Sequence, residues 1–282
     1  MKRILAILLL ICTFCLSGCN IKQDVDLMFD SFEKSANIVL LTRFELVVNT
    51  SHYDLDEIKY NGKQCNIVFL EESGFYSYTY DQEDLSVDIL YTSYDNFETI
   101  CYGTEILPSR IINAFFADNR FWFRMDDPDT DEFQQTYYSW SVDTKQKDIV
   151  DSVSDDYEYS EDNNRSERYS FAYTSKLFGD CLEITDNETG ITKRIDSSVL
   201  NTFEEGKQIK KARSSTAFGI QQVFEDNGNI YFASFFGVNF LGDPCYCYVY
   251  KWNFETENCE FYTFVRFETF QEWVTDMYIK TN

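Results

Sequence analysis

Alternation of aromatic and smaller residues predicts β-strands along much of this chain. Between Cys245 and Phe254, every second position carries an aromatic ring. These rings belong to Tyr246, Tyr248, Tyr250, Trp252 and Phe254. Side chains alternate across a strand, so the five rings are expected on one face of a sheet. Tyr138, Trp140 and Val142 show the same alternation earlier in the chain.

A short strand-and-turn signature recurs at intervals. Residues 138–144 read YSWSVDT and residues 250–256 read YKWNFET. Asn96–Thr99 repeats Asn253–Thr256 letter for letter, and Asn187–Thr189 keeps only the end. The closing threonines stand at positions 99, 144, 189 and 256, so two intervals are 45 residues and the third, at 67, is longer by 22. A fixed period of this length predicts a stacked array of small sheets, unless the short matches are coincidental.

Hydrophobic pattern and composition predict many further strands. They are Asn37–Val48, Gln64–Leu70, Phe75–Tyr80, Val87–Tyr94, Ile111–Ala117, Arg120–Met125, Thr136–Val142, Lys147–Val150, Tyr169–Tyr173, Cys181–Thr185, Thr192–Ile195, Phe218–Phe224, Asn229–Phe236 and Cys259–Phe267. Tight turns are expected at Asp118–Asn119, Asp143–Thr144 and Asp226–Gly228. We expect Arg194–Ser215 to hold the 22 extra residues, and Thr269–Asn282 to close the array with a strand or short helix.

The predicted fold class is all-β, a β-propeller-like array of about five small antiparallel sheets. A β-sandwich or open stacked sheets is the alternative architecture. The pattern over residues 75–267 resembles bacterial propeller lipoproteins in a general way, although it lacks the Gly-His and Trp-Asp marks of the common repeat class. We expect the aromatic rings to pack between sheets, because repeated residues are usually architectural, although a platform for sugar rings or a peptide is the alternative.

The amino-terminal residues predict export and a lipid anchor. Lys2 and Arg3 precede a short apolar run that is too brief to span a bilayer comfortably, and Leu16–Cys19 follows. This stretch resembles the bacterial lipoprotein signal, which implies that residues 1–18 are removed and that Cys19 carries a diacylglycerol. An uncleaved anchor helix is the alternative. Residues 19–30 would then form a tether and residues 31–282 a single β-rich domain on the extracytoplasmic face of the cell membrane.

Charge narrows the range of partners. The chain has a formal net charge of −24, and removal of residues 1–18 would leave −26. Nucleic acid and anionic lipid would be repelled by such a chain. Lys207, Lys210, Lys211 and Arg213 form the only basic cluster after the signal. We expect the acidic stretch Asp151–Arg168 to be a solvated loop.

Two groups of residues are candidates for metal or thiol chemistry. Asp127, Asp129 and Asp131 alternate in a loop, a spacing that can bind calcium, although a solvated hairpin loop is the simpler interpretation. The cysteines after Cys19 are Cys65, Cys101, Cys181, Cys245, Cys247 and Cys259. Their even number permits disulfides outside the cytoplasm, and buried free thiols explain them equally well.

No pattern identifies a catalytic residue. His52, the only histidine, is expected in a polar loop without a serine elbow or an activated cysteine nearby. The sequence therefore favours a non-catalytic lipoprotein that binds a protein, peptide or glycan and has no cofactor other than the possible calcium ion. An envelope glycosidase that uses paired carboxylates is the alternative, although no pair can be named. A third possibility is an accessory subunit or sensor.

Overall fold

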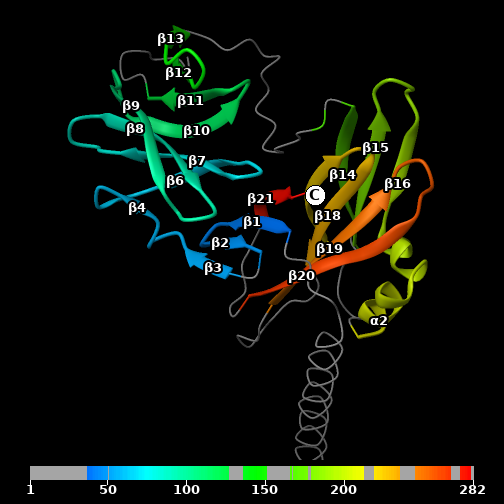
Figure 1. Ribbon diagram of the computed structural model, residues 1–282. Coiled ribbons are helices and arrows are strands. Elements are labelled where there is room, and N and C mark those ends of the chain that lie inside the picture. The colour runs from blue at the N-terminus through cyan, green and yellow to red at the C-terminus, as the bar shows by residue number, and fades with distance from the viewer. Residues whose placement is uncertain are drawn as a thin grey trace, which may run out of the picture. The chain divides into compact units, whose positions relative to one another are not determined.

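The chain forms two compact units (Figure 1). The computed structural model describes residues 37–49, 51–126, 136–150, 166, 168–176, 179–212, 219–235, 245–267 and 274–280. One unit comprises Asn37–Arg165 and Gln271–Asn282, and the other contains Ser166–Phe270. Each unit consists of small antiparallel sheets, which we number I to V and describe unit by unit.

The first unit holds three four-stranded sheets and a short hairpin. Sheet I is β21 (Val274–Ile279), β1 (Ile38–Thr42), β2 (Glu45–Val48) and β3 (Ser51–Asp54). Sheet II is β6 (Asn66–Leu70), β7 (Gly74–Tyr80), β8 (Ser86–Ser93) and β9 (Thr99–Ile106). Sheet III is β10 (Ile111–Ala117), β11 (Arg120–Met125), β12 (Thr136–Ser141) and β13 (Lys147–Val150). The hairpin is β4 (Lys59–Tyr60) with β5 (Lys63–Gln64).

The second unit holds two sheets and the helical residues of the described chain. Sheet IV is β14 (Tyr169–Lys176), β15 (Gly179–Asp186) and β16 (Thr192–Ile195). A short 3-10 helix η1 (Ser197–Asn201) and helix α2 (Glu204–Ala212) follow. Sheet V is β17 (Gly219–Asp226), β18 (Asn229–Phe235), β19 (Cys245–Asn253) and β20 (Cys259–Phe267). The described chain is thus all-β and propeller-like, as its alternation predicts.

Sheet I joins the two ends of the described chain. β21 pairs antiparallel with β1, so that Ile279 lies opposite Ile38. The buried carboxylate of Asp276 on β21 accepts a 3.2 Å hydrogen bond from the amide of Leu70 on β6. The tail therefore supplies a closing strand, one of the two forms expected from sequence, and ties sheet I to sheet II.

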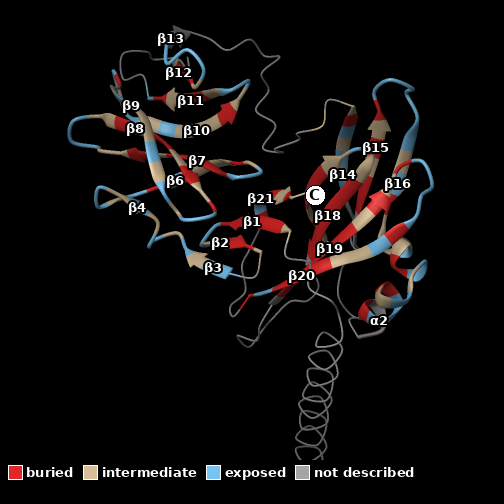
Figure 2. Cartoon of the chain, viewed as in Figure 1, coloured by how far each residue is buried: buried red, intermediate tan, exposed pale blue. Residues whose placement is uncertain are grey.

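Aromatic rings fill the spaces between neighbouring sheets of one unit. Between sheets II and III, Tyr76 stacks on Phe116 with ring centroids 4.6 Å apart. Trp140 comes so close to Gly103 that a Cβ atom there would lie 3.3 Å from its ring. The opposite face of sheet II packs against sheet I, and sheets IV and V share a third core. Figure 2 shows buried residues concentrated in the strands and exposed residues at the turns.

Four sheets, II to V, share one turn, which joins the last two strands of each sheet. Its first residue is Ser93, Ser141, Asp186 or Asn253. In each turn the amide of that residue donates to the carbonyl five positions later. The residue four positions later has positive φ: Phe97, Lys145, Gly190 or Glu257. The turn is therefore a true structural repeat.

This turn corrects the register of the sequence repeat. Thr144, Thr189 and Thr256 each lie three residues after the first turn residue, as the threonine spacing requires. Asn96 occupies that position in sheet II, and Thr99 is already the first residue of β9. The literal Asn96–Thr99 match is therefore offset by three residues, and the first interval is 48 residues rather than 45.

Three further local predictions differ from the structure or are refined by it. Asn37–Val48 is two strands rather than one, because the Oγ1 of Thr42 accepts the amides of Phe44 and Glu45 and turns the chain. His52 lies in strand β3 rather than in a loop. The extra residues after Arg194 form η1 and α2.

Candidate functional site

Two of the sequence-predicted sites lie outside the described residues. Cys19 falls before Asn37, and Asp127, Asp129 and Asp131 fall between Asp126 and Thr136. Within the described residues, no group of three histidine, cysteine or acidic side chains is placed to hold a metal ion. Lipidation at Cys19 and calcium binding therefore stay predictions.

The imidazole of His52 lies against the carboxylate of Glu45. Its Nδ1 lies 2.9 Å from the Oε2 of Glu45 on the neighbouring strand β2. The imidazole is 39% exposed. The contact joins β2 to β3 at the outer edge of sheet I, and a solvent-exposed pair of this kind contributes little to stability.

Among the five cysteines whose side chains are described, no two form a disulfide with each other; the five are Cys65, Cys101, Cys181, Cys247 and Cys259. Four of them are buried, and Cys101 is partly exposed. Burial raises the pKa of Cys259 to about 12, with a smaller contribution from the charge of Glu260. A thiol with such a pKa is protonated at neutral pH and is a poor nucleophile.

The aromatic stripe on β19 lies in the core. Its five rings are at most 4% exposed. Tyr248 and Tyr250 pack with Leu182 and Ile184 of sheet IV. The packing interpretation is therefore confirmed for this stripe, and these rings cannot act as an open platform for sugar rings.

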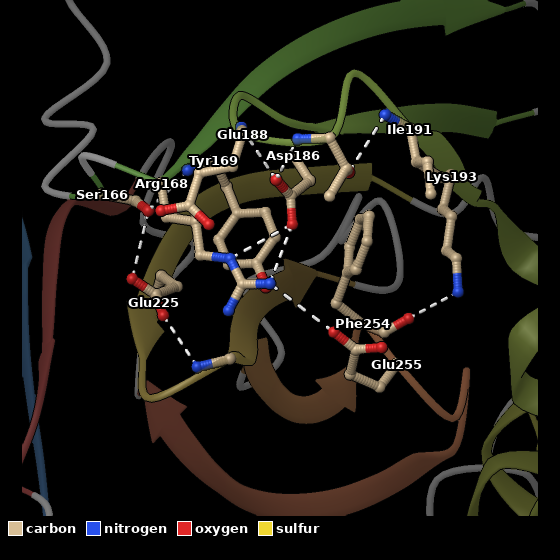
Figure 3. Close-up of polar contacts among 12 residues, drawn as sticks. Ser166, Arg168, Tyr169, Asp186, Glu188, Ile191, Lys193, Glu225, Phe254 and Glu255 are labelled. Atoms are coloured by element: carbon tan, nitrogen blue, oxygen red, sulfur yellow. Dashed lines mark hydrogen bonds and ion pairs between the residues drawn. The ribbon is translucent and has the colours of Figure 1, made fainter.

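A polar cluster lies where sheets IV and V meet. Its centre is Asp186, the last residue of β15, whose side chain is 1% exposed. Arg168, just before β14, donates from Nε and Nη2 to Oδ2 of Asp186 at 3.1 and 2.9 Å. The amides of Glu188 and Thr189 donate to Oδ1 at 2.9 and 3.0 Å. Figure 3 shows the guanidinium facing this carboxylate.

Local sequence explains this geometry. Asp186 opens the repeated turn, and a short acidic side chain at that position readily accepts amides two and three residues ahead. Burial alone would raise the pKa of Asp186. The amides of Thr189 and Glu188 and the guanidinium of Arg168 outweigh that effect, so the pKa lies below the ordinary value for an aspartate.

The cluster extends from sheet IV onto sheet V. Nη2 of Arg168 lies 3.5 Å from Oε1 of Glu255, and the guanidinium stands 5.0 Å above the ring of Tyr169. Lys193 on β16 donates to the carbonyl of Phe254 at 2.6 Å and pairs with Glu257 at 3.0 Å. Turn residues of sheet V therefore serve as partners for basic residues of sheet IV.

Ser166 adds a further contact between the start of β14 and sheet V. Ser166 Oγ donates to Oε2 of Glu225 at 3.1 Å and accepts the amide of Tyr169 at 2.9 Å. Oε1 of Glu225 accepts the amide of Gly228 in the hairpin turn of sheet V. The Ser166 hydroxyl therefore links the residues that precede β14 to the hairpin turn of sheet V.

These contacts describe an electrostatic clamp between two sheets rather than a catalytic centre. The carboxylate of Asp186 is saturated by donors, and both basic residues face protein acceptors. Sequence reasoning noted Asn187–Thr189 only as a partial repeat and did not find the clamp. The detectable signal was the turn chemistry of Asp186, but its pairing with Arg168 depends on the fold.

Comparisons with known proteins identify no family. No family model and no curated protein matches the chain. Solved structures with partial likeness include TolB from Acinetobacter baumannii, which is 10% identical in sequence and gives a TM-score of 0.28. The match covers 82% of this chain and 54% of TolB. An uncharacterized protein from Listeria monocytogenes EGD-e gives 10% identity, 82% and 63% coverage and a TM-score of 0.29.

A third likeness is to the WD40 domain of SCAP from fission yeast, at 11% identity, 80% and 55% coverage and a TM-score of 0.23. The chain thus spans less than two thirds of each of these three structures. Likeness at these TM-scores carries no argument about function. The described residues include no helix that is long and apolar enough to cross a bilayer.

Proposed function

We propose that this chain is a lipoprotein anchored at the extracytoplasmic face of the cell membrane, where its propeller-like sheets form a non-catalytic binding domain. The observation that carries the proposal is the sequence Leu16–Cys19 behind a charged start and a short apolar run. Lipid on Cys19 would hold the domain at the membrane, because two or three acyl chains give stable anchoring.

The partners and protonation of the polar side chains in the described residues support the non-catalytic part of the proposal. The histidine of the chain pairs with Glu45, and the buried carboxylate of Asp186 accepts four hydrogen bonds. Cys259 is held as a protonated thiol. The glycosidase alternative gains no named pair of acid and nucleophile from the described residues.

The ligand class follows from charge and from the position of the rings. A net charge of −24 disfavours nucleic acid. Because the β19 rings are buried, recognition would use loops, where binding residues commonly lie on a rigid scaffold. A protein, peptide or glycan is therefore the proposed partner class.

Fatty-acid labelling of the full chain in a bacterial host tests the anchor. Wild type should incorporate a labelled fatty acid and fractionate with membranes, and Cys19→Ser should lose both properties. Cys15→Ser is the matched control, because it removes a neighbouring signal-peptide cysteine and should retain the label. Label that persists in Cys19→Ser would refute the proposal.

The binding domain needs a separate measurement. Purified full chain should bind envelope polysaccharide or envelope protein without changing it, as judged by mass spectrometry of the recovered material. Hydrolysis that persists through purification, and that a substitution in this chain abolishes, would replace the non-catalytic proposal with the glycosidase alternative.

A further inference from the structure

The sequence contains two Asn–Gly pairs, and each forms the two-residue turn of a β-hairpin. Asn61–Gly62 joins β4 to β5, and Asn227–Gly228 joins β17 to β18. Asn61 and Gly62 have φ angles of 49° and 81°, and the corresponding angles of Asn227 and Gly228 are 49° and 76°. Positive φ at both central residues is typical of a type I′ turn, which favours asparagine followed by glycine. The chain therefore holds the same dipeptide in the same kind of turn at two places.

An asparagine that precedes glycine can react with its own backbone. The backbone nitrogen of the glycine attacks the side-chain amide carbon of the asparagine, so that a carbon–nitrogen bond forms and a five-membered succinimide ring closes. The side-chain nitrogen leaves as ammonia and takes the proton of the backbone amide with it. Water then opens the ring at either carbonyl, which gives aspartate or isoaspartate. Glycine favours the reaction, because it has no side chain to hinder the attacking nitrogen.

We infer that Asn61 is a site of spontaneous deamidation in the folded chain, and that the structure around Asn227 protects the second pair from the same reaction. Ring closure requires the backbone nitrogen and the side-chain carbon to meet, and for this the peptide must rotate out of the turn. The rate at each pair therefore depends on how readily its hairpin opens. The inference concerns a chemical modification and does not depend on the lipid anchor or on the ligand.

Few backbone interactions close the β4–β5 hairpin. β4 and β5 contain two residues each and form a two-stranded sheet of their own. The opposed pairs are Lys59 with Gln64 and Tyr60 with Lys63. At the base of the hairpin, the amide of Cys65 donates to the carbonyl of Ile58 at 2.9 Å. A two-stranded hairpin without further strands is at best marginally stable in water, so this one should open often.

The surroundings of the Asn61–Gly62 turn add little to its stability. Both residues are exposed, and a Cβ atom at Gly62 would meet no heavy atom within 4 Å beyond its chain neighbours. Nζ of Lys63 pairs with Asp81 at 2.9 Å, but both side chains of this ion pair are about one third exposed. Such a pair contributes little to stability. The turn can therefore open while sheet II stays folded.

The Asn227–Gly228 turn is held closed by longer strands and by a specific acceptor. It joins strands of eight and seven residues within the four-stranded sheet V. The amide nitrogen of Gly228, which would be the attacking atom, donates to Oε1 of Glu225 at 2.9 Å. The carbonyl of Gly228 accepts the amide of Phe254 at 3.3 Å. Opening of this turn therefore breaks contacts that belong to the core of the second unit, which costs more free energy.

Deamidation at Asn61 would change both the charge and the shape of the turn. Either product adds one negative charge to a chain that already carries −24. Isoaspartate also places an additional carbon atom in the backbone, so a two-residue type I′ turn and the pairing of Tyr60 with Lys63 are not retained. The modification therefore alters the β4–β5 hairpin with time, whereas the neighbouring sheets keep their pairing.

Peptide mass spectrometry after timed incubation of the purified full chain tests the inference. Under mildly alkaline conditions, the peptides that contain Asn61 and Asn227 are followed for aspartate and isoaspartate. In the folded chain, Asn61 should deamidate about tenfold or more faster than Asn227, because the free energy of local opening is near zero in mobile turns and much larger in core strands. In urea neither hairpin persists, and the two pairs should react at similar rates.

Substitutions separate the contribution of each hairpin from that of the dipeptide. Asn61→Gln keeps an amide but would have to close a six-membered ring, so deamidation of this peptide should disappear. Glu225→Ala removes the acceptor of the Gly228 amide and should speed deamidation of Asn227 severalfold in the folded chain. Glu225→Gln is the matched control, because it keeps an acceptor oxygen and should have a smaller effect. If Glu225→Ala fails to fold, the comparison of folded and urea-unfolded wild type decides.

Three results would overturn the inference. Equal rates at Asn61 and Asn227 in the folded wild-type chain would show that the hairpins do not control reactivity. A folded chain in which Asn61 stays intact, although it reacts in urea, would show that the β4–β5 turn stays closed. Deamidation of the same peptide in Asn61→Gln would place the reaction at another residue.

Discussion

Trp140 and Trp252 occupy the same position in two different sheets. Each is the penultimate residue of a third strand, β12 or β19. Trp140 lies opposite Phe121, the second residue of β11, and Trp252 lies opposite Ile230, the second residue of β18. Both indoles are buried. The recurring tryptophan therefore belongs to the architecture of a repeated sheet.

Alanine at either tryptophan should destabilise the chain strongly. Trp140→Ala and Trp252→Ala each remove a buried ring from a core between two sheets, and a loss of about 3–5 kcal/mol is expected for such a change. Urea unfolding followed by circular dichroism measures it. Ile106→Ala is the control, because this side chain is 72% exposed and its truncation should have little effect. A tryptophan variant as stable as that control would contradict the architectural role.

The repeated turn predicts that substitutions at Lys145 and Gly190 change the stability of the chain in opposite directions. Lys145 has φ 53°, and Gly190 has φ 69° at the corresponding place in sheet IV. A residue with a Cβ atom is less stable than glycine in this left-handed conformation by roughly 1 kcal/mol. Lys145→Gly should therefore stabilise the chain by up to about 1 kcal/mol, and Gly190→Ala should destabilise it by about the same amount. Thermal unfolding would show it, and shifts of equal sign in the two variants would contradict the shared turn.

Local alternation predicted most strands but could not settle their register. The stripe from Tyr246 to Phe254 predicted β19 because aromatic residues alternate there without interruption. Strand β9 was missed, since Gly103 and the isolated threonines of that stretch weaken the same signal. The Asn96–Thr99 match placed the turn of sheet II three residues out of register. The turn is defined by its hydrogen bonds and φ angles, and the matching residue types occupy other positions of it.

The candidate site depends on contacts that are distant in sequence. Asp186 is predictable as a turn residue. Its contact with Arg168 arises only because β14 pairs with β15, and Glu255 comes from another sheet. Asp276 and Leu70 are joined across 206 positions of the chain. A pattern with period two carries no information about such pairs, and that is why the clamp was not predicted.

Protonation of Asp186 should loosen the contact between sheets IV and V. Its folded pKa lies below the ordinary value, so the carboxylate stabilises the fold above the unfolded pKa and loses this contribution as pH falls through the folded pKa. Asp186→Asn should be less stable than wild type at neutral pH, and the difference should narrow on acidification. Urea midpoints across the acidic range measure this.

The control for Asp186 is Glu188→Gln, the same acid-to-amide change at an exposed residue of the same turn. Its loss of stability at neutral pH should be smaller than that of Asp186→Asn, because the Glu188 side chain is exposed and accepts none of the four hydrogen bonds of the clamp. If Asp186→Asn and wild type differ equally at neutral and acidic pH, the carboxylate charge does not drive the clamp, and the effect of the variant is steric.

Cys259 should be unreactive until the chain unfolds. Burial raises the pKa of its thiol from 9.0 to about 12, so the folded chain keeps the thiol protonated while an unfolded chain ionises it. The resulting contribution to stability is present below pH 9 and is lost as pH rises through the folded pKa. At pH 8, alkylation by iodoacetamide, followed by mass spectrometry, should occur only at the rate of unfolding. Partly exposed Cys101 serves as the internal control and should react first. Alkylation of Cys259 in the native chain as fast as in urea would show that β20 does not bury this thiol.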